Sequence, residues 1–258
     1  MGIAARVKRL AARAGVGLVR QRELESLRED SGAAHDLAYL KALPEYAPRL
    51  LPLLDASKAQ LRQDLFALAM TEFKRGGYFV EFGATNGETL SNTHLLEKRF
   101  GWTGILAEPA RCWHAALEEN RDCTIDRRCV WHTSGERLPF SETGEAELST
   151  IAAFAGSDHH AASRRGASSY EVKTVSLTDL LVEHGAPAEV DYLSIDTEGS
   201  EFTILEAFDF ARYSFRVITC EHNYTSNRER IRRLLEAHGY ERRLDSISQF
   251  DDWYVRAA

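Results

Sequence analysis

The chain is poor in cysteine and lacks any long apolar run, and each shortage excludes a class of protein. Its 258 residues include only four cysteines, none in C-x-x-C spacing, so a secreted disulfide scaffold is not indicated. No segment approaches the roughly 20 apolar residues of a membrane-spanning helix, and the N-terminus lacks the apolar run of a signal peptide. We therefore expect an intracellular, cytoplasmic protein.

An excess of basic residues is also absent. The formal net charge of −7 argues against a protein that binds nucleic acid over its whole surface. With 44% hydrophobic and 28% charged residues, the composition is that of an ordinary globular protein. A chain of this length can form one sizeable domain with a small appendage.

Residues 1–56 are predicted to be a basic, helical extension with a linker, and residues 57–258 the main domain. The first 20 residues contain five basic side chains and no acidic one. A solvated helix is the expected structure, and weak peripheral contact with an anionic membrane surface is the alternative. The sequence leaves the oligomeric state open.

From Tyr78 onward, predicted strands alternate with predicted helices. Strands are expected at 78–82, 104–107, 124–131, 190–195, 215–220, 240–244 and 253–256, and helices at 88–100, 110–120, 176–184, 200–208 and 226–238. This pattern predicts an α/β, Rossmann-like fold with a mostly parallel seven-stranded sheet, helices on both faces and a C-terminal β-hairpin. A polar, poorly periodic segment at about 132–170 is predicted to be an insertion or mobile loop.

The first candidate binding motif is Glu-Phe-Gly-Ala-Thr-Asn-Gly at 81–87, directly after a predicted strand. Its small residues allow the backbone to approach a ligand, and the carboxylate of Glu81 can hold a cationic amine. A dinucleotide fingerprint would require glycine where Thr85 stands, so NAD ranks below S-adenosylmethionine. A purely structural turn remains an open alternative.

Further acidic residues follow the other predicted strands. Glu108 ends the second strand, where a carboxylate can accept hydrogen bonds from both ribose hydroxyls or simply face solvent. Asp196 and Glu198 would repel each other unless a proton, cation or hydrogen-bond donor lies between them. His222 is a candidate general base, although a lone histidine is more often structural.

These motifs, taken in order, resemble the FkbM family of methyltransferases. The first matching block comprises Gln63-Asp64, residues 78–87, Ser91-Asn92-Thr93, Leu96-Glu97-Lys98, residues 101–104 and Glu108-Pro109. Residues 191–201 resemble the second hallmark block. The resemblance covers about residues 57–244, and two blocks in the right order are far more specific than one glycine motif.

The resemblance implies a class I methyltransferase that transfers a methyl group from S-adenosylmethionine to a hydroxyl of a sugar, glycan or natural product. It implies a cofactor site formed by Glu81, Gly83, Ala84, Asn86, Gly87, Ser91, Asn92, Thr93 and Glu108. The family more often reads Gly-Ala-Asn-Asp-Gly, so Asn86 replaces a carboxylate here. The Ser-Asn-Thr segment has a second interpretation, as a helix cap.

Methylation of a neutral hydroxyl requires removal of its proton. Asp196 is the expected base, acting directly or with help from Glu198 or His222. A variant places Mg²⁺ between Asp196 and Glu221 at the ends of adjacent strands, where it would lower the pKa of the hydroxyl. His159-His160 is a weaker metal candidate.

The acceptor molecule is not identified by the sequence. Arg164-Arg165 in the polar segment could meet a phosphate or carboxylate, although a solvated charge pair is the simpler interpretation. Transfer to nitrogen or carbon, an NAD-dependent oxidoreductase and a non-catalytic interaction module remain alternative hypotheses.

Overall fold

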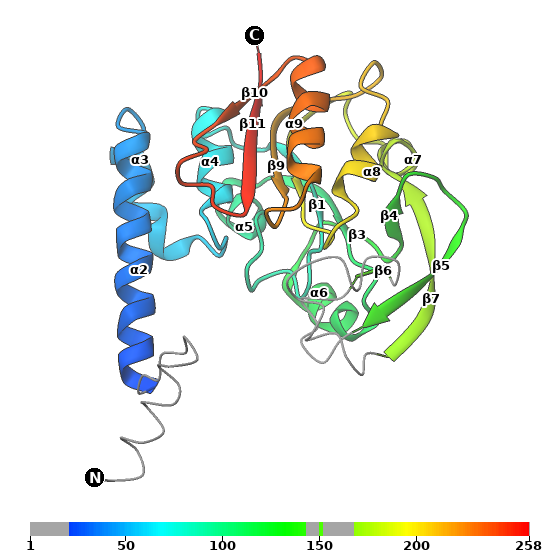
Figure 1. Cartoon of the computed structure of the whole chain (residues 1–258), viewed down its shortest axis with the longest axis horizontal. Helices are drawn as coiled ribbons and strands as arrows, with labels where there is room; N and C mark the ends of the chain where they lie inside the picture. Colours follow the sequence, from blue (N-terminus) through cyan, green and yellow to red (C-terminus); the bar gives the residue numbers. More distant parts are fainter. Residues whose placement is uncertain (1–20, 143–149, 152–167, 258) are drawn as a thin grey trace. The chain divides into compact units, whose positions relative to one another are not determined.

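The computed structural model describes residues 21–142, 150–151 and 168–257 (Figure 1). The chain divides into two compact units, Met1–Ala47 and Pro48–Ala258. In the first unit, helix α2 spans Gln21–Ala42. The basic segment and its membrane contact fall outside the described residues, and the domain limits 1–56 and 57–258 stay a prediction. No helix in the described part of the chain is long and apolar enough to cross a membrane.

Short helices precede the sheet. Helix α3 spans Ala47–Leu50, the 3₁₀ helix η1 Leu51–Ala56 and helix α4 Gln63–Met70. Side chains from Gln63 to Ala69 are buried all around α4, so this helix packs as an internal element rather than as an amphipathic surface helix.

The main sheet has the predicted seven strands. They are β1 (Tyr78–Phe82), β2 (Thr103–Ala107), β3 (Thr124–Asp126), β8 (Glu189–Ile195), β9 (Ser214–Glu221), β10 (Tyr240–Arg243) and β11 (Asp251–Arg256). Their order is β10-β11-β9-β8-β1-β2-β3. The strands from β9 to β3 in this order (β9, β8, β1, β2 and β3) are parallel to one another. Strand β11 runs antiparallel to both of its neighbours, β9 and β10. The central strands are buried on both faces, as expected of a parallel sheet that is covered by helices.

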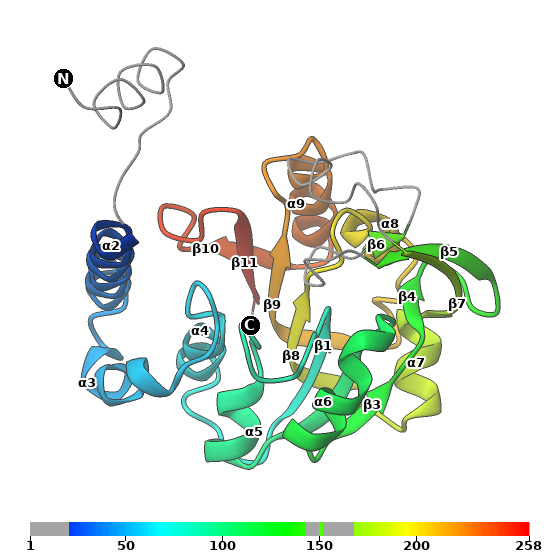
Figure 2. The ribbon, with the colours of Figure 1, turned by 90° about the horizontal axis from the view of Figure 1, so that it is seen from below.

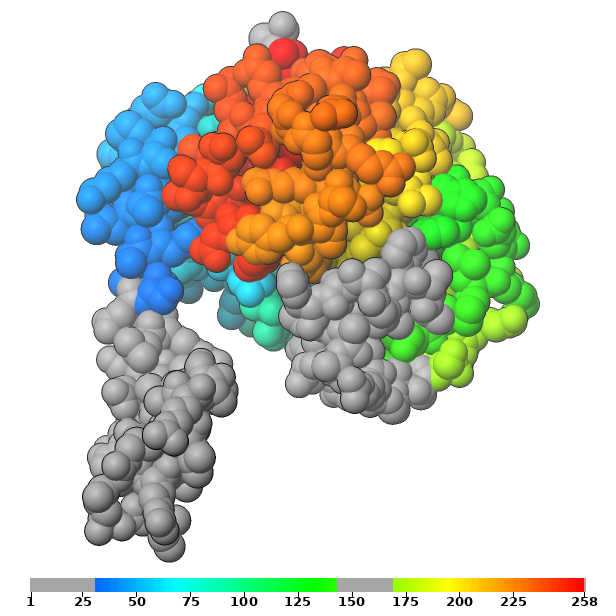
Figure 3. All heavy atoms as spheres, in the orientation of Figure 1, coloured from blue at the N-terminus to red at the C-terminus, as the bar shows by residue number. Residues whose placement is uncertain are grey.

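Helices cover the two faces of this sheet, as predicted (Figure 2). One face carries α5 (His94–Phe100) and α6 (His114–Asn120, after the 3₁₀ helix η2, Arg111–Trp113). The other carries α7 (Leu177–Glu183), α8 (Glu201–Glu206) and α9 (Asn227–Ala237). Ser176 caps α7 by accepting a 3.1 Å hydrogen bond from the Asp179 amide. Figure 3 shows α9 and the C-terminal strands, in orange and red, as one continuous surface.

The predicted strand at 124–131 is wrong as a single element, because two strands form there. Asp126 accepts hydrogen bonds from the amide and guanidinium of Arg128 and contacts His184, which turns the chain out of the sheet. Strand β4 (Cys129–Trp131) then pairs with β7 (Ser168–Ser176) in a second sheet.

The second sheet also corrects the expected loop at 132–170. Strand β5 (Arg137–Glu142) pairs antiparallel with β7 along its whole length, and β6 (Thr150–Ile151) adds to its other edge. The described part of the insertion is therefore regular structure, and its polarity reflects a thin, exposed sheet. Residues 143–149 and 152–167 lie outside the described residues, and with them the candidates His159, His160, Arg164 and Arg165.

Candidate functional site

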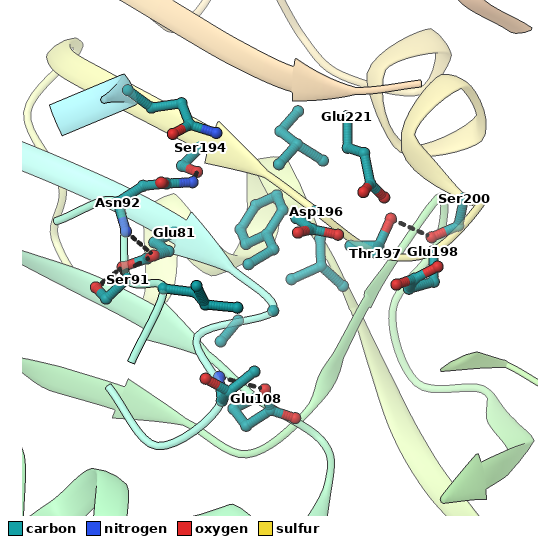
Figure 4. A pocket seen from close by; sticks show the side chains of 18 of the residues that line it. Glu81, Ser91, Asn92, Glu108, Ser194, Asp196, Thr197, Glu198, Ser200 and Glu221 are labelled. Atoms are coloured by element: carbon teal, nitrogen blue, oxygen red, sulfur yellow. Dashed lines mark hydrogen bonds between the residues drawn. The ribbon is translucent and has the colours of Figure 1, made fainter. Parts of the chain in front are cut away.

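A cavity of about 430 Å³ lies where β1, β2, β8 and β9 end, on both sides of the point where the strand order reverses (Figure 4). Six carboxylic acids line it: Glu81, Glu108, Asp196, Glu198, Glu221 and Asp251. Within the described residues, its lining contains no lysine, arginine or histidine. Phe82, Pro109, Val130 and Phe140 supply apolar surface. The volume and this mixture suit a small organic ligand.

Gly83 brings the two sides of the cavity together. Its φ of +72° favours glycine, and a Cβ there would lie 2.1 Å from the carbonyl oxygen of Asp196. Its amide also donates to the carbonyl of Ala107, the last residue of β2. No side chain fits at this crossing, so the ends of β1, β2 and β8 can meet around one opening.

Glu81 is buried inside the first motif and is bound by the chain itself. Its carboxylate accepts hydrogen bonds from the hydroxyl of Thr93 at 2.5 Å, the amide of Asn92 at 2.7 Å and the hydroxyl of Ser91. The guanidinium of Arg121 lies 3.7 Å away. The Ser-Asn-Thr segment is thus more than a helix cap: it satisfies a buried charge.

Arg121 was missed by the sequence analysis. It is fully buried after α6 and donates to the carbonyl of Gly87, the hydroxyls of Ser91 and Thr93 and the carboxylate of Glu97. One side chain therefore holds the middle and the end of the loop that begins at Gly83. The available signal was the carboxylate of Glu81 in an apolar strand, since a buried charge needs a partner.

Asn92 and Ser194 form a polar wall beside this loop. The amide nitrogen of Asn92 donates to the hydroxyl of Ser194 at 2.9 Å, and both residues line the cavity. The Oδ1 atom of Asn92 is buried and has no hydrogen-bond partner. Because buried acceptors are nearly always satisfied, this oxygen indicates a place for a donor from a bound molecule.

Glu108 follows β2 as predicted. Its two oxygens accept hydrogen bonds of 2.8 Å from the amides of Thr85 and Ala110, which orient the carboxylate at the cavity wall. Burial raises the pKa of Glu108 to about 7, and these two amides oppose the rise. Each oxygen retains a second acceptor position, which suits a pair of ligand hydroxyls.

A cluster of three carboxylates occupies the opposite wall. Asp196 and Glu198 follow β8, and Glu221 is the last residue of the adjacent β9. One oxygen of each lies within 4.8 Å of the others. Burial raises the pKa of Glu221 well above its usual range, and the charges of Asp196 and Glu198 raise it further. Oε2 of Glu221 is buried without a hydrogen-bond partner.

Residues 81–242, more than half of the chain, match the Methyltransferase FkbM domain. The chain belongs to the FkbM methyltransferase family. The family and the class I strand order support an S-adenosylmethionine-dependent methyltransferase. The resemblance seen in the sequence is thereby confirmed, together with the fold class.

Solved structures give only distant similarities. Precorrin-6y C5,15-methyltransferase from Geobacter metallireducens is 11% identical with a TM-score of 0.39, over 75% of this chain and 88% of that one. A putative RNA methyltransferase from Pyrococcus horikoshii is 10% identical with a TM-score of 0.39, over 76% and 82%. A putative sarcosine dimethylglycine methyltransferase from Galdieria sulphuraria is 13% identical with a TM-score of 0.32, over 70% and 62%. No curated protein matches the chain.

Several residues implied by the FkbM resemblance shape the loop without lining the cavity. Glu81, Gly83, Ser91, Asn92 and Glu108 line the cavity, whereas Ala84, Asn86, Gly87 and Thr93 do not. Asn86 accepts hydrogen bonds from the amides of Glu88 and Thr89, so it closes a turn. Here the side chain that replaces the usual carboxylate supports the loop locally.

His222 lies outside the cavity lining of this FkbM chain. It is buried beside Asp252, with 3.8 Å between its Nε2 and the Oδ1 of that carboxylate, and burial lowers its pKa. Its Nδ1 accepts a hydrogen bond from the amide of Tyr224. Neutral His222 therefore carries its proton on Nε2, which leaves neither nitrogen free to act as a base.

Asp251, by contrast, lines the cavity and was not predicted. It is paired in register with Glu221, and its Oδ2 accepts hydrogen bonds from Gln63 at 2.8 Å and Trp253 at 3.3 Å. Burial raises its pKa to about 7. Both partners are neutral, so Asp251 adds a titratable group to the same wall as Glu221.

Proposed function

We propose that this FkbM chain is an O-methyltransferase that methylates a hydroxyl group of a sugar, glycan or natural product with S-adenosylmethionine. The observation that carries the proposal is the carboxylate cluster of Asp196, Glu198 and Glu221 within the same cavity as Glu108 and Gly83. A hydroxyl acceptor must lose a proton when it is methylated, whereas a neutral amine can attack through its lone pair first. A group of carboxylates at the transfer site therefore favours oxygen.

The side chains present fit the cofactor. Glu108 would hold the ribose hydroxyls with its two open acceptor positions, and the orphaned Oδ1 of Asn92 would accept from the methionine ammonium. The apolar surface of Val130 and Phe140 would suit the adenine. When bound, S-adenosylmethionine supplies the methyl group on a positively charged sulfur, and an acidic cavity favours that charge over the neutral product.

Asp196 would accept the proton of the acceptor hydroxyl. The carboxylates of Glu198 and Glu221 lie beside it, with one oxygen of each residue within 4.8 Å of the others. General-base catalysis of this kind is worth about 10²–10⁴-fold in rate. His222 is not part of this proposal, because both of its nitrogens are engaged or protonated.

Mg²⁺ bound by Asp196 and Glu221 is the second route to the same activation. The cation would polarise the acceptor oxygen, so that the proton leaves without a strong base. The two routes differ in one requirement, because only the second depends on added metal.

The first test is calorimetric titration of the purified chain with S-adenosylmethionine and S-adenosylhomocysteine, with NAD as the control ligand. We expect the adenosyl compounds to bind, NAD not to bind, and Glu108→Ala to weaken the binding. Hydroxylated acceptors are then screened for methyl transfer, and Asp196→Asn should lower the rate by about 10²–10⁴-fold while the cofactor still binds. Absence of cofactor binding by folded protein would instead support a non-catalytic interaction module.

A further inference from the structure

The carboxylates of Asp196, Glu198 and Glu221 lie close together, although they come from two different segments of the chain. Strands β8 and β9 are parallel neighbours, paired up to Ile195 and Cys220, so the next residues, Asp196 and Glu221, lie side by side at the edge of the sheet. Figure 4 shows the carboxyl groups of Asp196 and Glu221 turned toward each other, with Glu198 beside them. Glu198 has a φ of +58°, a left-handed conformation that is uncommon for this residue type and occurs where ligands are held.

We infer that these three side chains form a binding site for one divalent cation, Mg²⁺ or Mn²⁺. Oxygen ligands lie about 2.0–2.1 Å from Mg²⁺, so two ligands of one ion are at most about 4 Å apart. The three candidate oxygens lie within 4.8 Å of one another, so small side-chain rotations suffice to bring them onto one ion. The cluster contains no cysteine or histidine, and hard cations prefer such an all-oxygen set.

An independent observation points to a ligand at this place. Oε2 of Glu221 is buried in a residue that lines the cavity, and it has no hydrogen-bond partner in the described part of the chain. A buried carboxylate oxygen without a donor is costly, and the cost is removed when a cation or a proton binds there. A coordinated ion would satisfy this oxygen.

The position of the site indicates what the cation would do. It lies on the cavity wall opposite Glu108, and a bound ion would keep coordination positions open toward the cavity. An acceptor hydroxyl bound there would lose its proton to water more readily. Its oxygen would then bond to the methyl carbon as the carbon–sulfur bond breaks, which leaves the sulfur neutral. This role rests on the proposed function, whereas cation binding itself does not.

The experiment is calorimetric titration of the EDTA-treated, full-length chain with MnCl₂, repeated with MgCl₂ and followed by electron paramagnetic resonance of bound Mn²⁺. We expect one Mn²⁺ per chain, with affinity lowered about 10–100-fold in Glu221→Gln and in Glu198→Gln. Asp251→Asn is the matched control, because it removes a carboxylate from the same cavity outside the cluster. It should lower the affinity less than either ligand variant does.

Failure of this inference can be told apart from failure of the proposed function. Each sample is also titrated with S-adenosylmethionine, and its folding is checked by circular dichroism. If folded wild type binds no Mn²⁺, or if the ligand variants match Asp251→Asn, the cation site is wrong even where the cofactor binds. If Mn²⁺ binds as expected and the cofactor does not, the site stands and the methyltransferase role fails.

Discussion

The two walls of the cavity hold buried carboxylates in different ways. On the β1 side, Glu81 receives three hydrogen bonds from its own chain and lies near the buried guanidinium of Arg121. On the β8–β9 side, Glu221 lies among other acids and keeps one buried oxygen without a partner. The carboxylate of Glu81 is therefore satisfied before any ligand binds, and the carboxylate of Glu221 is not.

This difference separates residues that stabilise the fold from residues that serve a ligand. Removing one member of a satisfied buried network leaves its partners uncompensated, which is strongly destabilising. Removing one of several neighbouring like charges relieves their repulsion and should stabilise the fold. Functional sites often contain such destabilising groups. Substitutions on the two walls should therefore change stability in opposite directions.

The largest effect is expected for Arg121→Met. This change takes the neighbouring cation from the buried carboxylate of Glu81 and leaves Glu97 with Lys98 alone, so it should lower the free energy of unfolding by about 3–5 kcal/mol. Urea denaturation followed by circular dichroism measures it. The control is Arg233→Met, which removes an exposed ion pair with Glu229 and should change stability by less than about 0.5 kcal/mol. Equal losses in the two variants would mean that the first wall is not a cooperative network.

The next effect lies at Gly83, where the walls meet. Gly83→Ala combines a left-handed backbone with a contact of 2.1 Å to a carbonyl oxygen, and we expect a loss of about 2–4 kcal/mol together with loss of cofactor binding. Gly239→Ala is the matched control, because its φ is +83° but nothing lies within 4 Å of the added Cβ. It should cost only about 1 kcal/mol and leave cofactor binding intact. Equal losses of cofactor binding in the two variants would show that backbone strain at the glycine, and not the close contact with the Asp196 carbonyl, causes the loss.

The residues at strand ends were predictable because one geometric rule covers them. Parallel strands place their carboxyl ends along one edge, so acids and glycines that follow apolar strands, such as Glu108, Gly83 and Asp196, had to meet. The rule uses only strand order and burial, both of which leave a periodic trace in the sequence. It says nothing of which oxygen faces which neighbour.

The missed features depend on contacts between distant segments. Arg121 follows a polar helix end and resembles a solvated cation, until Glu81 and Glu97 are placed around it. Asp251 looks like part of a turn, because acids are unfavourable in strands, yet β11 begins with it. The helix expected from residue 88 begins only at His94, because the preceding backbone binds Glu81 instead of extending the helix.

A smaller effect of the opposite sign is expected for Glu221→Gln. The substitution keeps the shape of the side chain and removes a carboxyl group whose pKa is raised well above its usual range by burial and by two like charges. Metal-free protein at neutral pH then no longer bears the cost of burying or protonating this group, and it should gain about 0.5–2 kcal/mol. Urea denaturation with EDTA present measures the gain. Glu241→Gln, which removes an exposed partner of Arg243, should be close to neutral. A destabilised Glu221→Gln protein would remove the contrast between the walls.

The smallest effect concerns Glu108, which shares a feature with each wall. Backbone amides orient its carboxylate, and no cation among the residues that the structure describes pairs with it. Its pKa of about 7, raised by burial and further by Asp196 and Glu142, makes the ligand-free carboxyl partly protonated at neutral pH. Ribose hydroxyls donate more strongly to the ionised form, so binding of S-adenosylmethionine should lower this pKa and release a proton. The affinity for S-adenosylmethionine should therefore be highest above about pH 8 and fall by up to about tenfold at pH 6.

Calorimetric titration across this pH range measures the affinity, and Glu108→Gln should bind the cofactor more weakly with a flatter pH profile. An unchanged slope in that variant would assign the titration to another acid of the cavity, of which Asp251, also with a pKa of about 7, is the first to examine.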